Sequence, residues 1–132
     1  MPEVRSALVV DDDELVRSTV VSVLAAREIA AVEAVDGKEA LELAQSVSFD
    51  LVISDLFMPG MDGLALIPEL RKRCPAAKII LTTGGSSMFP IGGSRIENLE
   101  EAARLLGASL VIRKPFRPSE LMAAVKSLEA AP

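Results

Sequence analysis

The stretch Ala7-Leu-Val-Val-Asp-Asp-Asp13 decides the fold, because a continuous apolar run passes directly into three acidic residues. A short apolar run of this kind is typical of a strand that is buried on both faces. From 14 to 27 the apolar spacing becomes helical, and the residues on the inward face are Val16, Val20, Val23 and Leu24. The segment therefore predicts a buried strand followed by a helix, with carboxylates at the junction.

The alternation between strand and helix repeats along the rest of the chain. Apolar runs predict further strands at 29–35, 49–54, 79–83 and 110–112. Helical spacing predicts helices at 38–46, from Leu64 up to Pro75, around 96–106 and at 118–128. Gly107 is well placed to cap the helix around 96–106. Pro68 predicts a displaced start or a kink in the helix that contains it, because proline has no N–H to donate.

Five strands that alternate with five helices indicate an α/β fold, with a parallel sheet covered by helices on both faces. We expect a flavodoxin-like, doubly wound sheet of five strands in the order 2-1-3-4-5, flanked by five helices. No linker or repeat divides the sequence, so residues 1–132 are expected to form one domain. In such folds the functional crevice lies at the carboxyl ends of the strands.

Composition excludes several classes of function. The net charge of -5 argues against binding of nucleic acid or an anionic membrane. The absence of histidine excludes serine–histidine and cysteine–histidine catalysis and the common zinc sites. The single cysteine, Cys74, cannot form an internal disulfide and is expected to be buried. Because no signal peptide or membrane-spanning run is present, we expect a soluble, cytoplasmic protein.

Polar residues that can carry chemistry follow four of the predicted strands. The first strand ends in Asp11, Asp12 and Asp13, the third in Asp55, the fourth in Thr83 and the fifth in Lys114. In the expected strand order, the acidic triplet and Asp55 meet at one edge of the crevice, with Thr83 and Lys114 beyond them. Carboxylates packed this closely repel one another unless a cation intervenes. A hard ion with oxygen ligands is the natural solution, and Mg²⁺ suits a site that also holds a phosphate.

These residues stand in motifs that resemble the bacterial response-regulator receiver domain. The motifs are Val9-Val-Asp-Asp12, Asp55-Leu-Phe-Met-Pro-Gly-Met-Asp-Gly63, Thr83 and Lys114-Pro-Phe116. Each motif is weak by itself, but together they occupy four strand ends in the order that the family has. The resemblance extends from about Ser6 to Leu128.

The resemblance implies that Asp55 is the phosphoacceptor, forming an aspartyl phosphate. It implies that Asp12 and Asp55 bind Mg²⁺ directly, that Asp11 acts through water, and that the backbone carbonyl of Phe57 completes the site.

The resemblance also implies the roles of the residues beyond the acidic cluster. Lys114 would contact the phosphoryl oxygens, and Thr83 would move to bond one of them on activation. A cis peptide bond is implied before Pro115. Asp13, which precedes a helix, is expected to be an N-cap rather than a fourth ligand, and Asp62 is expected to support the turn before the next helix.

The implied function is that of a stand-alone signalling domain. A sensor histidine kinase or a histidine phosphotransfer protein would donate the phosphoryl group, and the domain would turn over no external substrate. An unknown downstream protein would be reached along the face of the fourth helix, fifth strand and fifth helix. We expect a monomer or a weak phosphorylation-dependent dimer, with no nucleic-acid or membrane partner.

The sequence departs from the family pattern in the parts that convert phosphorylation into a change of shape. Val111 stands where a switch Tyr or Phe is frequent, three residues before Lys114. The segment 84–94 is long and rich in glycine, and we hypothesise that Phe89 contacts a partner or folds back on the fourth helix. Phe57 and Gly85 cannot orient an attacking water, which predicts a long-lived phosphorylated state.

Two other classes of function remain open at this point. Asp11-Asp-Asp13 has the spacing of a haloacid-dehalogenase-type phosphohydrolase, but Leu15 stands where Thr or Val is usual, and a cap and the later acidic pair are missing. A pseudo-receiver would be a binding module that works without phosphorylation. The acidic pair, Asp55 and Lys114 argue against it, whereas the missing aromatic at 111 favours it. A flavin-binding flavodoxin is disfavoured because carboxylates replace a phosphate-binding loop after the first strand.

Overall fold

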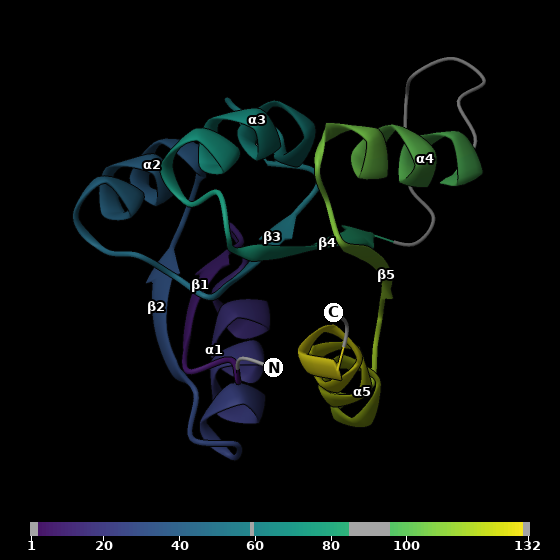
Figure 1. Ribbon diagram of the computed structural model, residues 1–132. Coiled ribbons are helices and arrows are strands. Elements are labelled where there is room, and N and C mark those ends of the chain that lie inside the picture. The colour runs from purple at the N-terminus through teal and green to yellow at the C-terminus, as the bar shows by residue number, and fades with distance from the viewer. Residues whose placement is uncertain (1–2, 59, 85–95, 131–132) are drawn as a thin grey trace.

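The computed structural model describes residues 3–58, 60–84 and 96–130, without the side chains of 96–99 and 130 (Figure 1). Within these residues, strands and helices alternate along the whole chain. The elements are β1 (Ser6–Val10), α1 (Glu14–Ala25), β2 (Ala30–Ala34), α2 (Gly37–Ser46), β3 (Leu51–Asp55), α3 (Gly63–Arg73), β4 (Lys78–Gly84), α4 (Ile96–Leu106), β5 (Leu110–Lys114) and α5 (Pro118–Ala130).

The five strands form one parallel sheet in the order β2-β1-β3-β4-β5. This order confirms the predicted flavodoxin-like α/β fold. The chain starts near the middle of the sheet, winds out to β2, and then returns past β1 to build β3, β4 and β5. The direction of winding therefore reverses between β1 and β3, and that is where ligand sites of such sheets lie.

The helices cover both faces of the sheet. Helices α2, α3 and α4 lie on one side, and α1 and α5 lie on the other (Figure 1). Successive residues of a strand pack into two separate cores, one on each face of the sheet. Leu8 and Val10 lie in the core under α2, α3 and α4. Ala7 and Val9 lie in the core under α1 and α5. A strand with a core on each side must be apolar at every position, which explains the continuous run from 7 to 10.

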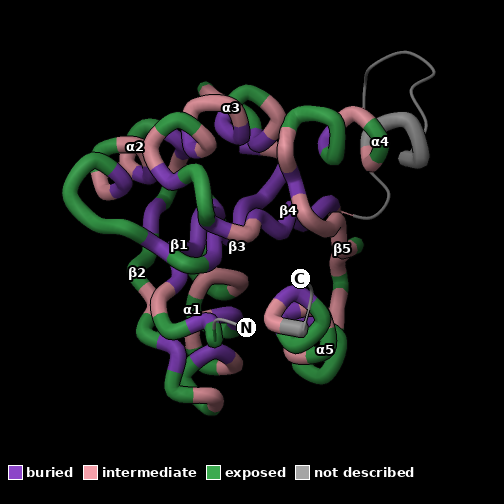
Figure 2. The backbone as a smooth tube through the Cα atoms, viewed as in Figure 1, coloured by how far each residue is buried: buried purple, intermediate pink, exposed green. Residues whose placement is uncertain are grey.

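The central strands are the buried ones. All residues of β3 are buried, and β1 and β4 are buried along most of their length, whereas β5 at the edge is partly exposed (Figure 2). Strand β2 forms the other edge, and only Ala34 at its end is buried. No helix in the described part of the chain is both long and apolar enough to span a bilayer.

The predicted element bounds need small corrections. Strand β5 extends through Lys114 rather than ending at 112, because it pairs with β4 as far as Gly84. Helix α3 begins at Gly63 and Pro68 lies inside it, so the first of the two predicted alternatives, a displaced start, is wrong, and the second, a kink, stays a prediction. Gly107 caps α4 as predicted: its φ is 124°, and its N–H donates to the carbonyls of Ala103 and Arg104.

Candidate functional site

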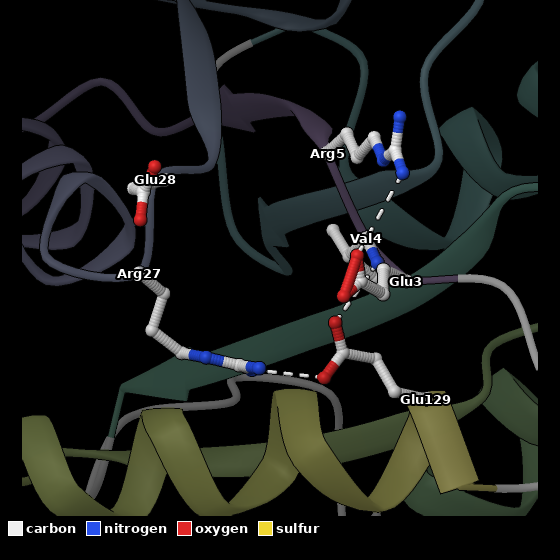
Figure 3. Close-up of a pocket in the computed structure, with 6 residues that line it drawn as sticks. All are labelled: Glu3, Val4, Arg5, Arg27, Glu28 and Glu129. Carbon is white, nitrogen blue, oxygen red and sulfur yellow. Dashed lines mark hydrogen bonds and ion pairs between the residues drawn. The ribbon is translucent and has the colours of Figure 1, made fainter.

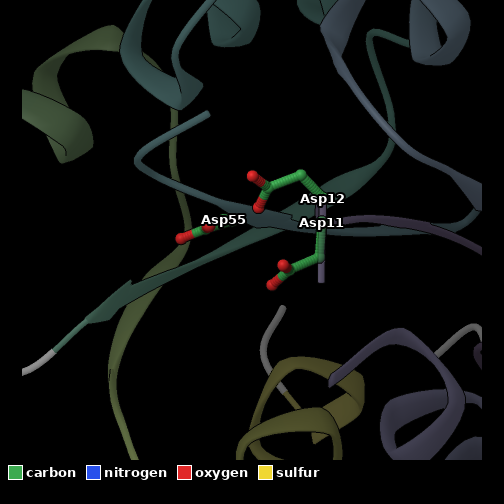
Figure 4. A group of neighbouring side chains, drawn as sticks. All are labelled: Asp11, Asp12 and Asp55. Atoms are coloured by element: carbon green, nitrogen blue, oxygen red, sulfur yellow. The ribbon is translucent and has the colours of Figure 1, made fainter. Parts of the chain in front are cut away.

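Three carboxylates converge at the carboxyl edge of the sheet (Figure 4). Asp11 and Asp12 follow β1 and Asp55 ends β3, and these two strands are neighbours in the sheet. One oxygen from each side chain lies within 4.8 Å of the others. Asp11 and Asp55 are buried and Asp12 is exposed. The predicted convergence of these three residues is confirmed.

Asp11 is fixed through its backbone and its side chain. Its N–H donates to the carbonyl of Ala34 at 3.1 Å, which extends the hydrogen bonding between β1 and β2 by one residue. Its Oδ1 accepts from the N–H of Asp13 at 2.9 Å. The turn after β1 therefore holds this carboxylate in one orientation, facing the end of β3.

Lys114 brings a positive charge to the cluster from β5. Its Nζ lies 2.9 Å from Asp11 Oδ2 and 3.5 Å from Asp55 Oδ1. Lys114 lies opposite Gly84 in the register of β4 and β5, at the same end of the sheet as Asp55. The Lys114–Pro115 peptide bond is cis, as the sequence motif implied. The predicted convergence of Lys114 on the acidic cluster is confirmed, whereas its contact with phosphoryl oxygens stays a prediction.

Burial and charge give the site unusual acid–base properties. Burial raises the pKa of the Asp55 carboxyl from 3.8 to about 6, and the Lys114 charge opposes this rise while the Asp11 charge adds to it. Burial alone would lower the pKa of Lys114, but the hydrogen bond to Asp11 and the charges of Asp55 and Asp11 raise it overall. Burial thus disfavours the ionised form of Asp55, whereas its two acidic neighbours favour the charged form of Lys114.

Thr83 is buried one residue beyond Thr82, the register partner of Asp55. Its Oγ1 makes no hydrogen bond to any residue that the structure describes. Most buried hydroxyls in proteins are paired, so this one is available for a ligand atom. Because side chains alternate along β4, Thr83 points to the same face of the sheet as Leu81, toward the core under α2, α3 and α4. Thr82 points to the opposite face. The structure does not join its hydroxyl directly to the carboxylates.

The backbone after β3 is tightly folded around Asp55. The N–H of Phe57 donates to Asp55 Oδ1 at 3.4 Å, and the N–H of Gly63 donates to the carbonyl of Leu56 at 2.8 Å. A Cβ on Gly63 would lie 2.7 Å from the Asp55 carbonyl oxygen and 2.9 Å from Leu56 Cα. Only glycine permits α3 to start this close to the strand end. The role of the Phe57 carbonyl as a ligand remains a prediction.

The two other aspartates near the site are caps, as predicted. Asp13 accepts from the N–H groups of Leu15 and Val16 at the start of α1. Asp62 accepts from the N–H of Ala65 at the start of α3. Their oxygens stabilise helix termini, which explains an acidic residue at each position without a ligand.

The donor set fits a small hard cation. Mg²⁺ prefers carboxylate, carbonyl and water oxygens at about 2.0–2.1 Å, so oxygens on neighbouring positions lie about 3 Å apart. One carboxylate oxygen each from Asp11, Asp12 and Asp55 lies within 4.8 Å of the others, so one ion could contact all three, either directly or through water. Asp12, which is exposed, leaves one side open to water and to a phosphate. The site therefore fits a Mg²⁺ ion that keeps several water ligands.

Sequence reasoning missed one residue that contacts the site. Arg17 on α1 donates from Nη1 to the backbone carbonyl of Asp11 at 2.8 Å and from Nε to Glu33 Oε1 at 2.9 Å. Arg17 lies four residues after Asp13, in the first turn of α1. Sequence analysis could not predict its bond to Asp11, because no residue pattern indicates a hydrogen bond to a backbone carbonyl. Val111 is partly buried against the core under α2, α3 and α4. Gly85, Phe89 and the rest of 85–95 lie outside the described residues.

A hollow of about 300 Å³ lies far from this chemistry, around the start of β1 and the ends of α1 and α5 (Figure 3). Its lining residues are Glu3, Val4, Arg5, Arg27, Glu28 and Glu129. Arg27 and Glu129 form an ion pair of 2.9 Å across it, and Glu129 also accepts from the N–H of Val4. These bonds tie α5 to the start of the sheet, which accounts for the charged lining as a structural feature.

Comparison with known proteins gives one consistent result. A family model described as the response regulator receiver domain matches residues 7–126. A probable transcriptional regulator, ycf27, from Cyanophora paradoxa is 37% identical over 124 residues, which cover 94% of this chain and 48% of that protein. The chain thus spans about half the length of the curated relatives it matches.

Solved structures agree with that match. A CheY-like response regulator receiver domain protein from Methanospirillum hungatei superposes with a TM-score of 0.82 at 26% identity, covering 96% of this chain and 94% of the other. A response regulator from Burkholderia pseudomallei superposes with a TM-score of 0.77 at 28% identity, covering 96% and 71%. That structure holds a phosphorylated aspartic acid, a calcium ion and citrate.

Proposed function

Since this chain belongs to the response regulator receiver domain family, and is therefore a phosphoacceptor domain of two-component signalling, we propose that Asp55 is the residue that accepts the phosphoryl group. The observation that supports this choice is the contact of one ammonium, Lys114 Nζ, with both Asp11 and Asp55. Asp11 lies nearer to the lysine, but both of its carboxylate oxygens already accept hydrogen bonds, from the Asp13 N–H and from Lys114 Nζ, each at 2.9 Å. The recorded contacts of the Asp55 carboxylate are longer, 3.4 Å to the Phe57 N–H and 3.5 Å to Lys114 Nζ, which favours Asp55 as the nucleophile.

The transfer follows from these positions. An Asp55 carboxylate oxygen attacks the phosphorus of the donor, a new O–P bond forms, and the P–N bond of a phosphohistidine breaks. The leaving imidazole takes up a proton from solvent. Asp12 and Asp55 would hold Mg²⁺ directly and Asp11 would hold it through water, and the ion would supply positive charge for the phosphoryl oxygens. The Phe57 carbonyl would be a further ligand.

Two side chains of the chain itself would stabilise the transferred group. Lys114 gives up part of its contact with Asp55 and donates to a phosphoryl oxygen, which replaces the carboxylate charge that the transfer neutralises. The Thr83 hydroxyl, which has no hydrogen-bond partner among the described residues, donates to another phosphoryl oxygen. Bonding Thr83 requires it to turn toward Asp55, and this movement would be the first step of the conformational signal.

The pseudo-receiver alternative is not favoured. A domain that binds partners without phosphorylation would have no need of a buried carboxylate with a pKa of about 6 next to a second buried carboxylate. Such a pair costs folding free energy and is retained where it serves chemistry. Val111, which favoured this alternative, lies against the core under α2, α3 and α4 and is not among the residues that form the acidic cluster.

We further propose that a sensor histidine kinase or a histidine phosphotransfer protein is the donor, and that an unidentified protein receives the signal. Receiver domains are generally signalling modules, and we propose that this one acts on no substrate other than its own Asp55. We also propose that residues 1–132 form a single receiver domain located in the cytoplasm, as a monomer or a weak dimer that forms on phosphorylation.

The test is incubation with acetyl phosphate and Mg²⁺, followed by intact mass measurement. We expect the parent protein to gain one phosphoryl group and Asp55→Asn to gain none. Asp62→Asn, an exposed aspartate that only caps α3, is the matched control and should gain one group. An unmodified parent under these conditions, or a modified Asp55→Asn variant, would contradict the proposal.

A further inference from the structure

We propose that Arg17 is a positioning residue for the metal and phosphoryl site, acting through the backbone carbonyl of Asp11. The inference rests on the proposed function, because it assumes that Asp11 helps to hold Mg²⁺. Arg17 itself touches none of the three site carboxylates in the contacts that the structure records for it.

The guanidinium of Arg17 lies between the end of β1 and the edge of β2. Its Nη1 donates to the Asp11 carbonyl at 2.8 Å, and its Nε donates to Glu33 Oε1 at 2.9 Å. The Arg17 side chain is only 12% exposed, so these bonds are shielded from competition by water. The planar fork of arginine holds two acceptors at a fixed angle, which a lysine cannot do.

The Asp11 carbonyl needs a donor because it lies beyond the last residue pair of the sheet. Pairing of β1 with β2 ends at Val10 and Ala34, and pairing of β1 with β3 ends at Val10 and Ser54. Asp11 is buried, so its carbonyl oxygen requires a hydrogen bond from the protein. Arg17 supplies that bond at the point where the sheet can no longer do so.

Four bonds consequently fix Asp11: its N–H to Ala34, its carbonyl from Arg17, its Oδ1 from Asp13 and its Oδ2 from Lys114. Three of the four come from β2, α1 and the turn between β1 and α1. Removing Arg17 leaves the peptide after Asp11 free to rotate, and the carboxylate moves with it. Residues that orient a metal ligand commonly affect metal affinity by about 10–100-fold.

Glu33 orients the guanidinium from the edge strand. Glu33 is the register partner of Val9, whose side chain packs in the core under α1 and α5. The Glu33 side chain therefore lies on the α1 side of the sheet, where it meets Arg17. The contacts then form a continuous series from β2 to β5: Glu33 to Arg17, Arg17 to Asp11, Asp11 to Lys114, and Lys114 to Asp55. The edge strand is thus connected to the phosphorylation site through named bonds.

The sign of the effect separates positioning from simple electrostatics. Arg17 carries a positive charge near the proposed cation site, so removing that charge alone would strengthen Mg²⁺ binding. Loss of the bond to Asp11 would weaken it. Arg17→Met keeps much of the side-chain volume and removes both the charge and the bond, so the direction of the change in affinity decides between the two.

The experiment measures Mg²⁺ dissociation constants by calorimetry for the parent, Arg17→Met, Arg17→Lys and a control. The control is Arg27→Met, which breaks the 2.9 Å ion pair with Glu129 at the opposite end of the sheet. Urea unfolding in EDTA gives the stability of each variant. Hydrogen exchange of the Asp13 amide, which bonds Asp11 Oδ1, reports the order of the site without any metal.

We expect Arg17→Met to weaken Mg²⁺ binding by roughly tenfold and to speed exchange of the Asp13 amide. Arg17→Lys should fall between Arg17→Met and the parent, and Arg27→Met should bind Mg²⁺ like the parent even if it is equally destabilised. Unchanged or tighter binding in Arg17→Met, or an equal loss in Arg27→Met, would overturn the inference. A parent protein that does not bind Mg²⁺ would instead refute the proposed function.

Discussion

Replacing Asp55 with asparagine should stabilise the metal-free protein, and more so at pH 8 than at pH 5. The Asp55 carboxyl has a pKa of about 6 in the folded protein against an ordinary value of 3.8, mainly because it is buried. The folded state therefore binds more protons than the unfolded state between these two values. Folding stability consequently falls as the pH rises through this window, and the loss is complete above pH 6.

The size of the effect follows from the shift. A rise of about two pKa units corresponds to about 3 kcal/mol of lost stability once the carboxyl is ionised. Asp55 is buried, but its carboxylate lies beside the exposed Asp12 at the carboxyl end of the sheet, where salt screens part of that figure, so we expect a gain of about 1–3 kcal/mol for Asp55→Asn at pH 8. At pH 5 part of the carboxyl is already protonated in the folded protein, and the gain should be roughly half as large.

The assay is urea unfolding in EDTA at both pH values, with Asp62→Asn as the control. Asparagine caps a helix about as well as aspartate, so the control should change stability by less than about 0.5 kcal/mol. Adding Mg²⁺ at pH 8 should stabilise the parent and not Asp55→Asn. An Asp55→Asn variant no more stable than the parent at pH 8, or a gain that does not shrink at pH 5, would refute this reasoning.

Three further substitutions test other parts of the site. Lys114→Met should raise the pKa of Asp55 further, because the positive charge that lowers this pKa is lost, and NMR titration measures the shift. The same variant should be phosphorylated by acetyl phosphate about 10–100-fold more slowly. An unchanged pKa would contradict this account. Gly63→Ala should destabilise the protein by about 1–3 kcal/mol in urea, since its Cβ would lie 2.7 Å from a backbone oxygen. Gly84→Ala should change stability little, since its Cβ would meet no atom of the described residues within 4 Å. Thr83→Val should increase metal-free stability by about 1 kcal/mol, because it removes a buried hydroxyl that lacks a partner among the described residues, and a loss of stability would show that the hydroxyl is bonded.

The sequence predicted the sheet well because its strands are buried on both faces. A strand such as β3, with every residue buried, leaves a continuous apolar run that is easy to recognise. The caps were also predictable, since Asp13, Asp62 and Gly107 occur where helices start or end. Edge strands gave weaker signals: β5 continues to Lys114 beyond its apolar residues.

The acidic site was predictable because parallel strands bring their carboxyl ends to one edge. Asp11, Asp12, Asp55 and Lys114 all meet there, as expected. The position of Arg17 was not predictable, because its partner is a backbone carbonyl, which every residue has. Its role depends on where the pairing of β1 stops, and only the three-dimensional register shows this.

The resemblance to receiver domains singled out Thr83 over its neighbour Thr82, which residue type alone could not do. Asp55 pairs with Thr82, which lies on the same face of the sheet as Asp55, whereas Thr83 extends one residue further and turns to the opposite face. The unpartnered hydroxyl within the described residues favours Thr83 as the one that responds to phosphorylation.

The most direct test of the central claim is to locate the phosphoryl group itself. The protein is treated with acetyl phosphate and Mg²⁺, the acyl phosphate is reduced with borohydride to the corresponding alcohol, and peptides are sequenced by mass spectrometry. We predict that homoserine replaces aspartate at position 55, with Asp11 and Asp12 unchanged. Reduction at Asp11 or Asp12 in place of Asp55, or no reduction at any aspartate, would contradict the account.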